Sequence, residues 1–211
     1  MRCNLKELNI SECTFSYSGA FKLFNALKDY KELKTLILDR NYFAAKDNMK
    51  MTALKEVLYR TKIEKLSIND CHLGEEGGKA VGEALQEYRF CILQTISARH
   101  NNFKDEVAKA FAIGMKVSSK LEKLDLSCNN IGDAGGELIT EALQSNSSLV
   151  SLNLSRNNLR VTSAALFVEA VEMNPNILHL KLNDNLITKD FISAIDGHLR
   201  KNKTNHELNT A

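Results

Sequence analysis

Tryptophan is missing from this sequence of 211 residues, and proline occurs once. A chain with one proline has no proline-rich linker between domains. Without tryptophan, and with aromatic residues at 7%, it also lacks the material of an aromatic-rich binding cleft. The net charge is +2, which is too small for the strongly basic surface that follows nucleic-acid phosphates. The composition therefore argues against nucleic acid as a partner.

Long apolar runs are missing too. No stretch reaches the roughly 18 apolar residues that a membrane-spanning helix needs. The first ten residues, MRCNLKELNI, contain no apolar core of a secretion signal. We therefore expect a cytoplasmic chain with no membrane insertion.

Cysteine is scarce and badly spaced for a metal or disulfide site. The five cysteines form no C-x-x-C pair, and their number is odd. They are Cys3, Cys13, Cys71, Cys91 and Cys128. A zinc site or a disulfide framework would need better spacing, so reduced structural thiols are predicted.

A pattern that is present, and repeated, is L-x-x-L-x-L-x-x-[N/C]-x-[LIF]. It begins at Leu5, Leu33, Ile63, Leu93, Leu121, Leu149 and Ile177. The steps between these starts are 28 or 30 residues. Self-similarity at such a period indicates a solenoid, in which each unit contacts its neighbours.

Each unit predicts one short strand and one helix. The fourth and sixth positions are apolar and alternate with polar ones, as a half-buried strand requires. In the fifth repeat Ile139, Ala142 and Leu143 form an inward helical stripe, with Glu137 and Glu141 on the outer side. Strands that pair in parallel beside wider helices curve the stack. We therefore expect an α/β fold, a curved right-handed solenoid with parallel strands on the concave face and helices on the convex face.

The ninth position of each unit is predicted to turn inward and to satisfy backbone groups of the neighbouring turn. This structural ladder consists of Cys13, Asn41, Cys71, Asn101, Asn129, Asn157 and Asn185. Cysteine keeps a small, weakly polar group in the same place, so we favour a structural role for Cys13 and Cys71 over a reactive one.

The repeat length, with IGDAGGELITEAL after the asparagine of the fifth unit, resembles the ribonuclease-inhibitor-like subclass of leucine-rich repeat proteins. That subclass includes ribonuclease inhibitor, the sensing domains of NOD-like receptors, Ran GTPase-activating protein and tropomodulin. The resemblance covers about residues 5 to 200. We expect residues 1–211 to form a single domain, with a polar C-terminal tail at 201–211.

The resemblance implies a non-enzymatic scaffold that binds a protein through its concave face or an end. Two alternatives stay open: a GTPase-activating module like Ran GTPase-activating protein, and a structural piece of a larger assembly. The identity of a protein partner is not predicted.

Catalytic, cofactor and metal sites find no support in the residues. The segment LGEEGGKAVG places Ala80 after Lys79, whereas a phosphate-binding loop needs serine or threonine there and wider glycine spacing. Glycines fill the same places in the fifth repeat, so we interpret them as turn and helix-start residues. No histidine has a second histidine at helical spacing, and no serine lies in a nucleophile elbow. We expect no enzyme.

The third, fifth, seventh and eighth positions of each unit are predicted to project toward the concave side. The candidate protein-binding residues are Glu7, Asp39, Arg40, Lys65, Asp70, Arg99, His100, Lys123, Asp125, Arg156, His179 and Lys181. Their charges predict a face that runs from mildly acidic to mildly basic. Arg99 and Arg156 are the expected anchors, since arginine offers directed, charge-assisted hydrogen bonds.

The N-terminal edge is the last expectation. The first repeat begins at Leu5, which leaves no room for a capping element before the strand of Leu8 and Ile10. A terminal repeat without a cap shows its core and an unpaired strand to water. We expect upstream residues or another chain to cover this edge.

Overall fold

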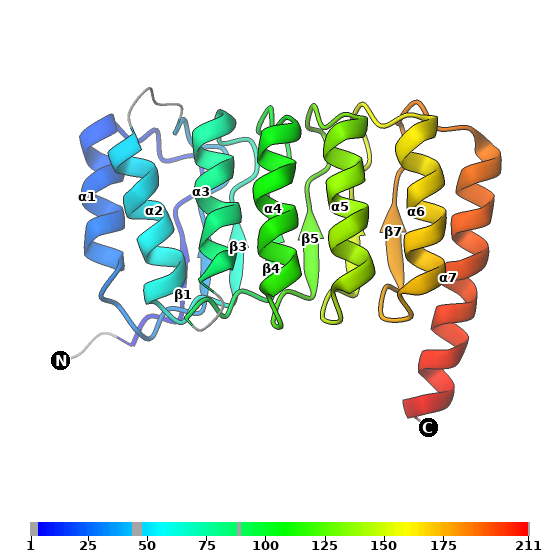
Figure 1. The fold of residues 1–211 in the computed structure, drawn as a ribbon. Helices are drawn as coiled ribbons and strands as arrows, with labels where there is room; N and C mark the ends of the chain where they lie inside the picture. Colours follow the sequence, from blue (N-terminus) through cyan, green and yellow to red (C-terminus); the bar gives the residue numbers. More distant parts are fainter. Residues whose placement is uncertain (1–3, 44–47, 88–89, 211) are drawn as a thin grey trace.

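The computed structural model describes residues 4–43, 48–87 and 90–210. Within these ranges seven strands alternate with seven helices (Figure 1). The strands are β1 (Glu7–Asn9), β2 (Thr35–Ile37), β3 (Lys65–Ser67), β4 (Thr95–Ser97), β5 (Lys123–Asp125), β6 (Ser151–Asn153) and β7 (His179–Lys181). The helices are α1 (Tyr17–Leu27), α2 (Asn48–Arg60), α3 (Gly74–Gln86), α4 (Asp105–Val117), α5 (Asp133–Ser145), α6 (Val161–Met173) and α7 (Lys189–Thr210).

The strands form one parallel sheet in chain order, from β1 to β7. Their register pairs the third position of each repeat with the third position of the next, from Glu7 with Thr35 to Ser151 with His179. The helices stand in a row along one side of this sheet (Figure 1). The predicted α/β solenoid, with parallel strands on the concave face and helices on the convex face, is confirmed.

The core lies between the sheet and the row of helices. The middle residue of each inner strand is buried, as Leu36 and Leu124 show. In α5, Ile139, Ala142 and Leu143 are buried, and this is the stripe that the sequence predicts. A buried leucine or isoleucine side chain stabilises the fold by roughly 1.5–3 kcal/mol relative to an exposed one. Stacking therefore supplies the apolar burial that one repeat cannot make alone.

Helices α3 and α4 approach each other through glycine. A Cβ on Gly82 would lie 2.7 Å from the carbonyl carbon of Ala110, and one on Gly114 would lie 2.7 Å from the oxygen of Gly82. The glycines of the excluded phosphate loop have a similar packing role. Gly77 and Gly78 lie inside α3 and are buried.

Aspartates at the start of one helix cap the start of the next. The Asp105 carboxylate accepts a hydrogen bond from the backbone N–H of Gly132 at 2.7 Å. Asp133 accepts from the N–H of Arg160 at 2.8 Å and from the hydroxyl of Ser163 at 2.6 Å. Helix starts carry unpaired N–H groups and a partial positive charge, so these carboxylates join neighbouring repeats.

The two ends of the solenoid differ. Strand β1 is poorly covered, and Leu5 beside it is 38% exposed. At the other end α7 reaches beyond the other helices (Figure 1). The polar residues 201–210 continue this helix, and its Asn202 is buried. The covering of the N-terminal edge stays a prediction.

Candidate functional site

The side chains of the asparagines at the ninth position form hydrogen bonds with backbone groups of their own and the neighbouring repeat. The Asn129 side-chain oxygen accepts from the N–H groups of Asn101 at 2.9 Å and Phe103 at 3.1 Å. Its amide donates to the carbonyls of Ala98 at 3.1 Å and Leu126 at 2.9 Å. Among the described residues, no buried side-chain nitrogen or oxygen is without a hydrogen bond. The ladder positions the turns after the strands and leaves no group for a ligand.

Cysteine at this position behaves in two ways. Cys71 is buried, and its thiol donates to the carbonyls of Leu38 at 3.1 Å and Asn69 at 3.3 Å. Burial raises the pKa of the Cys71 thiol to about 12, so the thiol is protonated at neutral pH. Cys13 is exposed, and its thiol donates to the carbonyl of Ser11 at 3.4 Å.

The eighth position of every repeat has a left-handed backbone, which the sequence reasoning missed. The residues are Glu12 (φ 58°), Arg40 (56°), Asp70 (54°), His100 (55°), Cys128 (56°), Arg156 (55°) and Asp184 (57°). Aspartate and histidine adopt this conformation more readily than most residues. Because arginine and cysteine also occur at the eighth position, the residue types alone do not indicate a left-handed backbone there. The conformation comes three residues after the end of each strand, so these residues lie at the edge of the concave face.

A second polar network runs across the concave face. Asp39 accepts from the hydroxyl of Ser67 at 2.7 Å and from the N–H of Asn69 at 2.8 Å. Asn69 in turn accepts from the hydroxyl of Ser97 at 2.7 Å and from the N–H of Arg99 at 2.9 Å. Here the acceptor stands at the seventh position and the serine at the fifth position of the next repeat.

In the fifth and sixth repeats the acceptor stands at the fifth position and the serine at the seventh position. Asp125, at a fifth position, accepts from the hydroxyl of Ser127 at 2.6 Å and from the amide of Asn153 at 3.0 Å. Asn153 accepts from the hydroxyl of Ser155 at 2.6 Å. The exchange of serine with Asp or Asn between the two columns is visible in the sequence and marks where this network changes its direction. Asp39 and Asp125, both candidate binding residues, therefore have structural partners.

The structure places the candidate residues in three kinds of position. Those on strands are Glu7, Lys65, Lys123, Asp125, His179 and Lys181; those two residues after the end of a strand are Asp39 and Arg99; those at the left-handed edge are Arg40, Asp70, His100 and Arg156. Of the two expected anchors, Arg156 is paired, with its Nε 3.1 Å from Asp184. Arg99 is exposed and has no ion pair within the described chain.

Three lysines on the strands carry charge without a counter-ion. Lys65, Lys123 and Lys181 are exposed and form no salt bridge with any described residue. Lys123 and Lys181 line a shallow hollow in the concave face, together with Ser97 and Ser151. Two of these three unpaired lysines, Lys123 and Lys181, therefore lie in the C-terminal repeats.

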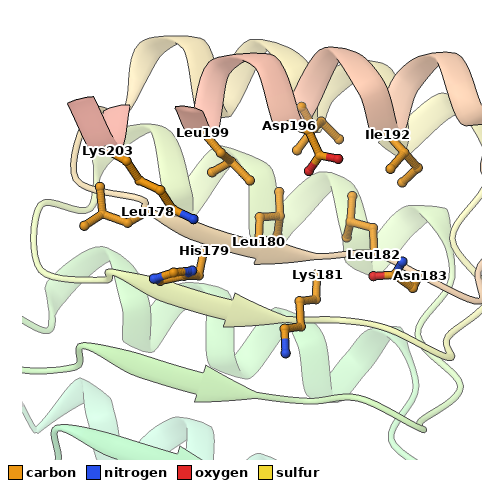
Figure 2. Close-up of a pocket in the computed structure, with 11 residues that line it drawn as sticks. Leu178, His179, Leu180, Lys181, Leu182, Asn183, Ile192, Asp196, Leu199 and Lys203 are labelled. Carbon is orange, nitrogen blue, oxygen red and sulfur yellow. The ribbon is translucent and has the colours of Figure 1, made fainter. Parts of the chain in front are cut away.

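A groove opens between β7 and α7 (Figure 2). Leu180 of β7 and Leu182, the first residue after this strand, point toward the helix, and Ile192 and Leu199 point back from the helix. Lys203 of α7 points toward His179. These side chains give the groove an apolar floor and a basic rim.

The positive charges of this region act on one another. Burial lowers the pKa of His179, and the charges of Lys203, Lys181 and Lys123 lower it further. His179 is therefore neutral at pH 7, and the surrounding charge comes from the lysines. A negative group placed here would relieve this repulsion.

Metal-ligating side chains do not cluster in the described part of the chain. There, no group of three or more His, Cys, Asp or Glu side chains converges as a metal site would require. No described helix is both long enough and apolar enough to cross a bilayer.

Comparison with known proteins follows the same repeats. The Leucine Rich repeat family matches residues 3–24, 60–82, 117–139 and 145–166. The chain is similar to the tropomodulin C-terminal domain of Caenorhabditis elegans at 13% identity, covering 93% of this chain and 98% of that one, with a TM-score of 0.57. Leiomodin-1 Actin-Binding Site 2 matches at 17% identity, covering 63% of this chain and 78% of that one, also at 0.57.

A third similar structure is a chain from the Rad7 and Elc1 complex in yeast, at 16% identity and a TM-score of 0.52. The match covers 87% of this chain and about half, 51%, of that one. No curated protein matches the sequence. At these identities the structural matches establish the fold alone. The chain therefore has a leucine-rich repeat fold, with seven stacked strand–helix repeats, and the family model matches four segments of it.

Proposed function

We propose that the chain is a non-enzymatic protein-interaction module that binds its partner through the concave face of its C-terminal repeats, from β5 to α7. The observation that carries the proposal is the contrast in pairing on that face. Its aspartates, asparagines and serines bond to one another, whereas Lys123 and Lys181 are exposed without counter-ions. Unpaired charge on an otherwise satisfied surface is available to a partner.

The repeat architecture and the similar structures support this proposal. Repeats of 28–30 residues with a helix in each unit agree with the ribonuclease-inhibitor-like subclass, to which we assign the chain. One similar structure is named as an actin-binding site, and another comes from a complex of Rad7 with Elc1. A stack of short strands gives such proteins an extended surface for recognition.

A cytoplasmic location and the lack of catalysis complete the proposal. Cys13, Cys71, Cys91 and Cys128 are free thiols. Burial raises the pKa of Cys91 to about 11 and that of Cys71 to about 12, which suits structural thiols rather than nucleophiles.

Site-specific photo-crosslinking in cells tests the proposed face. A benzophenone amino acid replaces Ser151 on the concave face in one variant and Ile113, an exposed residue of α4, in a matched control. We expect the Ser151 variant to crosslink a defined protein that the Ile113 variant does not. Equal crosslinks from both positions, or none from Ser151, would contradict the proposal. A crosslinked GTPase whose hydrolysis the protein accelerates would favour the GTPase-activating alternative.

A further inference from the structure

The sheet ends at β7 with backbone groups that earlier strands use for pairing. In the preceding repeat the N–H of Leu154 donates to Lys181 at 2.8 Å, and the N–H of Arg156 donates to Asn183 at 2.8 Å. The equivalent donors of the last repeat belong to Leu182 and Asp184, and neither has a hydrogen-bond acceptor among the described residues. Hydrogen bonds of this kind join each three-residue strand of the sheet to the next. The edge of β7 therefore offers the same pattern of backbone groups to a further strand.

The carbonyl of Leu178 belongs to the same edge. Its equivalent in the preceding repeat, the carbonyl of Val150, accepts from the N–H groups of Leu178 at 2.9 Å and His179 at 3.0 Å. Within the described chain no donor reaches the Leu178 carbonyl. The carbonyl of Leu178 and the N–H groups of Leu182 and Asp184 therefore lie unpaired along this edge.

Beside this edge lies the apolar floor of the groove. Leu180 and Leu182 come from the β7 segment, while Ile192, Ile195 and Leu199 come from α7 (Figure 2). A neighbouring hollow shares Leu182 and Ile192 and continues the floor to Ile187. The floor is aliphatic and has no aromatic side chain on which nucleic-acid bases could stack.

The rim of the groove is basic. His179, Lys181 and Lys203 line it, and Asp196 is the acidic residue that lines it with them. Neither Lys181 nor Lys203 pairs with a described carboxylate, and Asp184 at the edge is engaged by Arg156. Lys123 lies across the adjoining hollow from Lys181. A segment that lies along β7 therefore meets a surplus of positive charge on its concave side.

We propose that the groove binds an extended segment of a partner protein, in which acidic residues alternate with apolar ones, as an eighth strand added to β7. Side chains of a strand point alternately to opposite faces. One set enters the aliphatic floor, whose rim Lys203 lines, and the other lies beside Lys181 on the concave side. Added strands gain affinity from main-chain hydrogen bonds and specificity from alternate side chains. This inference rests on the proposed protein-binding function and specifies its site and partner chemistry.

The test uses a short synthetic peptide that alternates valine and glutamate, with the 211-residue protein. Matched peptides replace glutamate by lysine or valine by serine, and two further versions carry N-methyl groups on alternate amides in either phase. We expect the valine–glutamate peptide to bind, with hydrogen exchange slowed at the amides of Leu182 and Asp184. Both replaced peptides should bind weakly, and one N-methyl phase should lose binding because it blocks the strand edge.

Reversing the charge of single lysines tests where the acidic side chains of the peptide lie. Lys181→Glu and Lys203→Glu should each weaken binding on the order of tenfold, and added salt should reduce the difference. Lys109→Glu, an exposed change on α4, should leave affinity unaltered. Thermal unfolding of each variant checks that the fold is retained.

Several outcomes would overturn the inference. These are binding of the lysine peptide at equal strength, no protection at Leu182 and Asp184, or tighter binding of an oligonucleotide of equal charge. A dimer in light scattering that Lys181→Glu dissociates would assign the groove to a second copy of the chain and would also refute it. If the peptide fails while Ser151 still gives a specific crosslink, the proposed function stands and the groove is wrong. If both fail, both are wrong.

Discussion

The N-terminal repeats, from β1 to α3, and the C-terminal repeats, from β5 to α7, have the same fold but are joined differently. Ion pairs connect neighbouring helices in the first group. Lys28 of the first repeat lies 3.5 Å from Glu56 of α2, and Lys55 lies 3.0 Å from Glu83 of α3. Pairs at the surface contribute little, typically less than about 1 kcal/mol, and salt screens them.

In the C-terminal repeats, asparagine side-chain amides connect neighbouring repeats near the C-terminal ends of α5 and α6. The Asn146 amide donates to the carbonyl of Met115 at 2.7 Å, and the Asn174 amide donates to Leu143 at 2.6 Å and Asn146 at 2.8 Å. Asn202 continues the series in α7, with its amide 3.1 Å from the carbonyl of Ile177. All three asparagines are buried. This second asparagine series crosses repeat boundaries without using charge.

Charges on the helices and charges on the strands are used differently. Between the helices α2 and α3, Lys55 is neutralised by Glu83. On the strands, Lys65, Lys123 and Lys181 form no salt bridge with a described residue, and neither does Lys203 of α7. Three of these four lysines belong to the C-terminal repeats, which therefore carry most of this unpaired positive charge.

The largest loss of stability should come from disturbing the contact between α3, the last helix of the N-terminal group, and α4, which lies between the two groups. Gly82→Val places side-chain atoms where backbone atoms of Ala110 and Phe111 already stand within 2.8 Å of a Cβ. We expect a loss of about 3 kcal/mol in the free energy of unfolding. Urea denaturation measures it, and Gly197→Val in α7, where nothing lies within 4 Å of a Cβ, is the control. Equal stability of both variants would show that the helices can move apart without cost.

Removing one rung of the second asparagine series should have the next largest effect. Asn174→Ala leaves the carbonyls of Leu143 and Asn146 without their donor, which we expect to cost about 2 kcal/mol. Denaturant unfolding at pH 7 gives the value. A loss no larger than that of a surface change such as Lys109→Ala would contradict the structural role of this series.

The cap between α5 and α6 should contribute less and should depend on pH. Burial raises the pKa of Asp133, but hydrogen bonds from Ser163 and Arg160 outweigh it, so the folded pKa lies below the ordinary value of 3.8. The ionised carboxylate then stabilises the fold above pH 4, and this contribution is lost as the pH falls through the folded pKa. We expect Asp133→Ala to cost about 1 kcal/mol at pH 7.

Asp133→Asn is the matched variant, since it keeps an acceptor and removes the charge. Its stability should change less than that of the wild type between pH 5 and pH 3, measured by thermal or urea unfolding. A pH dependence identical to the wild type would show that the carboxylate is not the titrating group.

The smallest effect should belong to the N-terminal ion pairs. A double-mutant cycle on Lys55→Ala and Glu83→Ala should give a coupling energy of about 0.5 kcal/mol that falls as salt is added. A coupling as large as the Asn174→Ala loss would remove the contrast between the two groups of repeats.

Features that depend on neighbours in the chain could be predicted from the sequence. The period places every strand, and the helical stripe of Ile139, Ala142 and Leu143 is correct because its spacing follows from the turn of a helix. The inward ninth position could be predicted for a similar reason. Each repeat needs a polar group where its turn would otherwise be buried without partners.

The sequence by itself determined the strand–helix repeat, its stacking and the identity of the apolar face. Stacking alone decided which charges remain free, because partners such as Lys55 and Glu83, or Asp133 and Ser163, lie about one repeat apart and meet across a boundary. It also decided that Asp39 and Asp125 bond within the face, while β7 keeps an unpaired edge beside α7. A repeat pattern describes what each unit shares with the others, whereas the binding surface arises from side chains that differ between units and from the place where the stack ends.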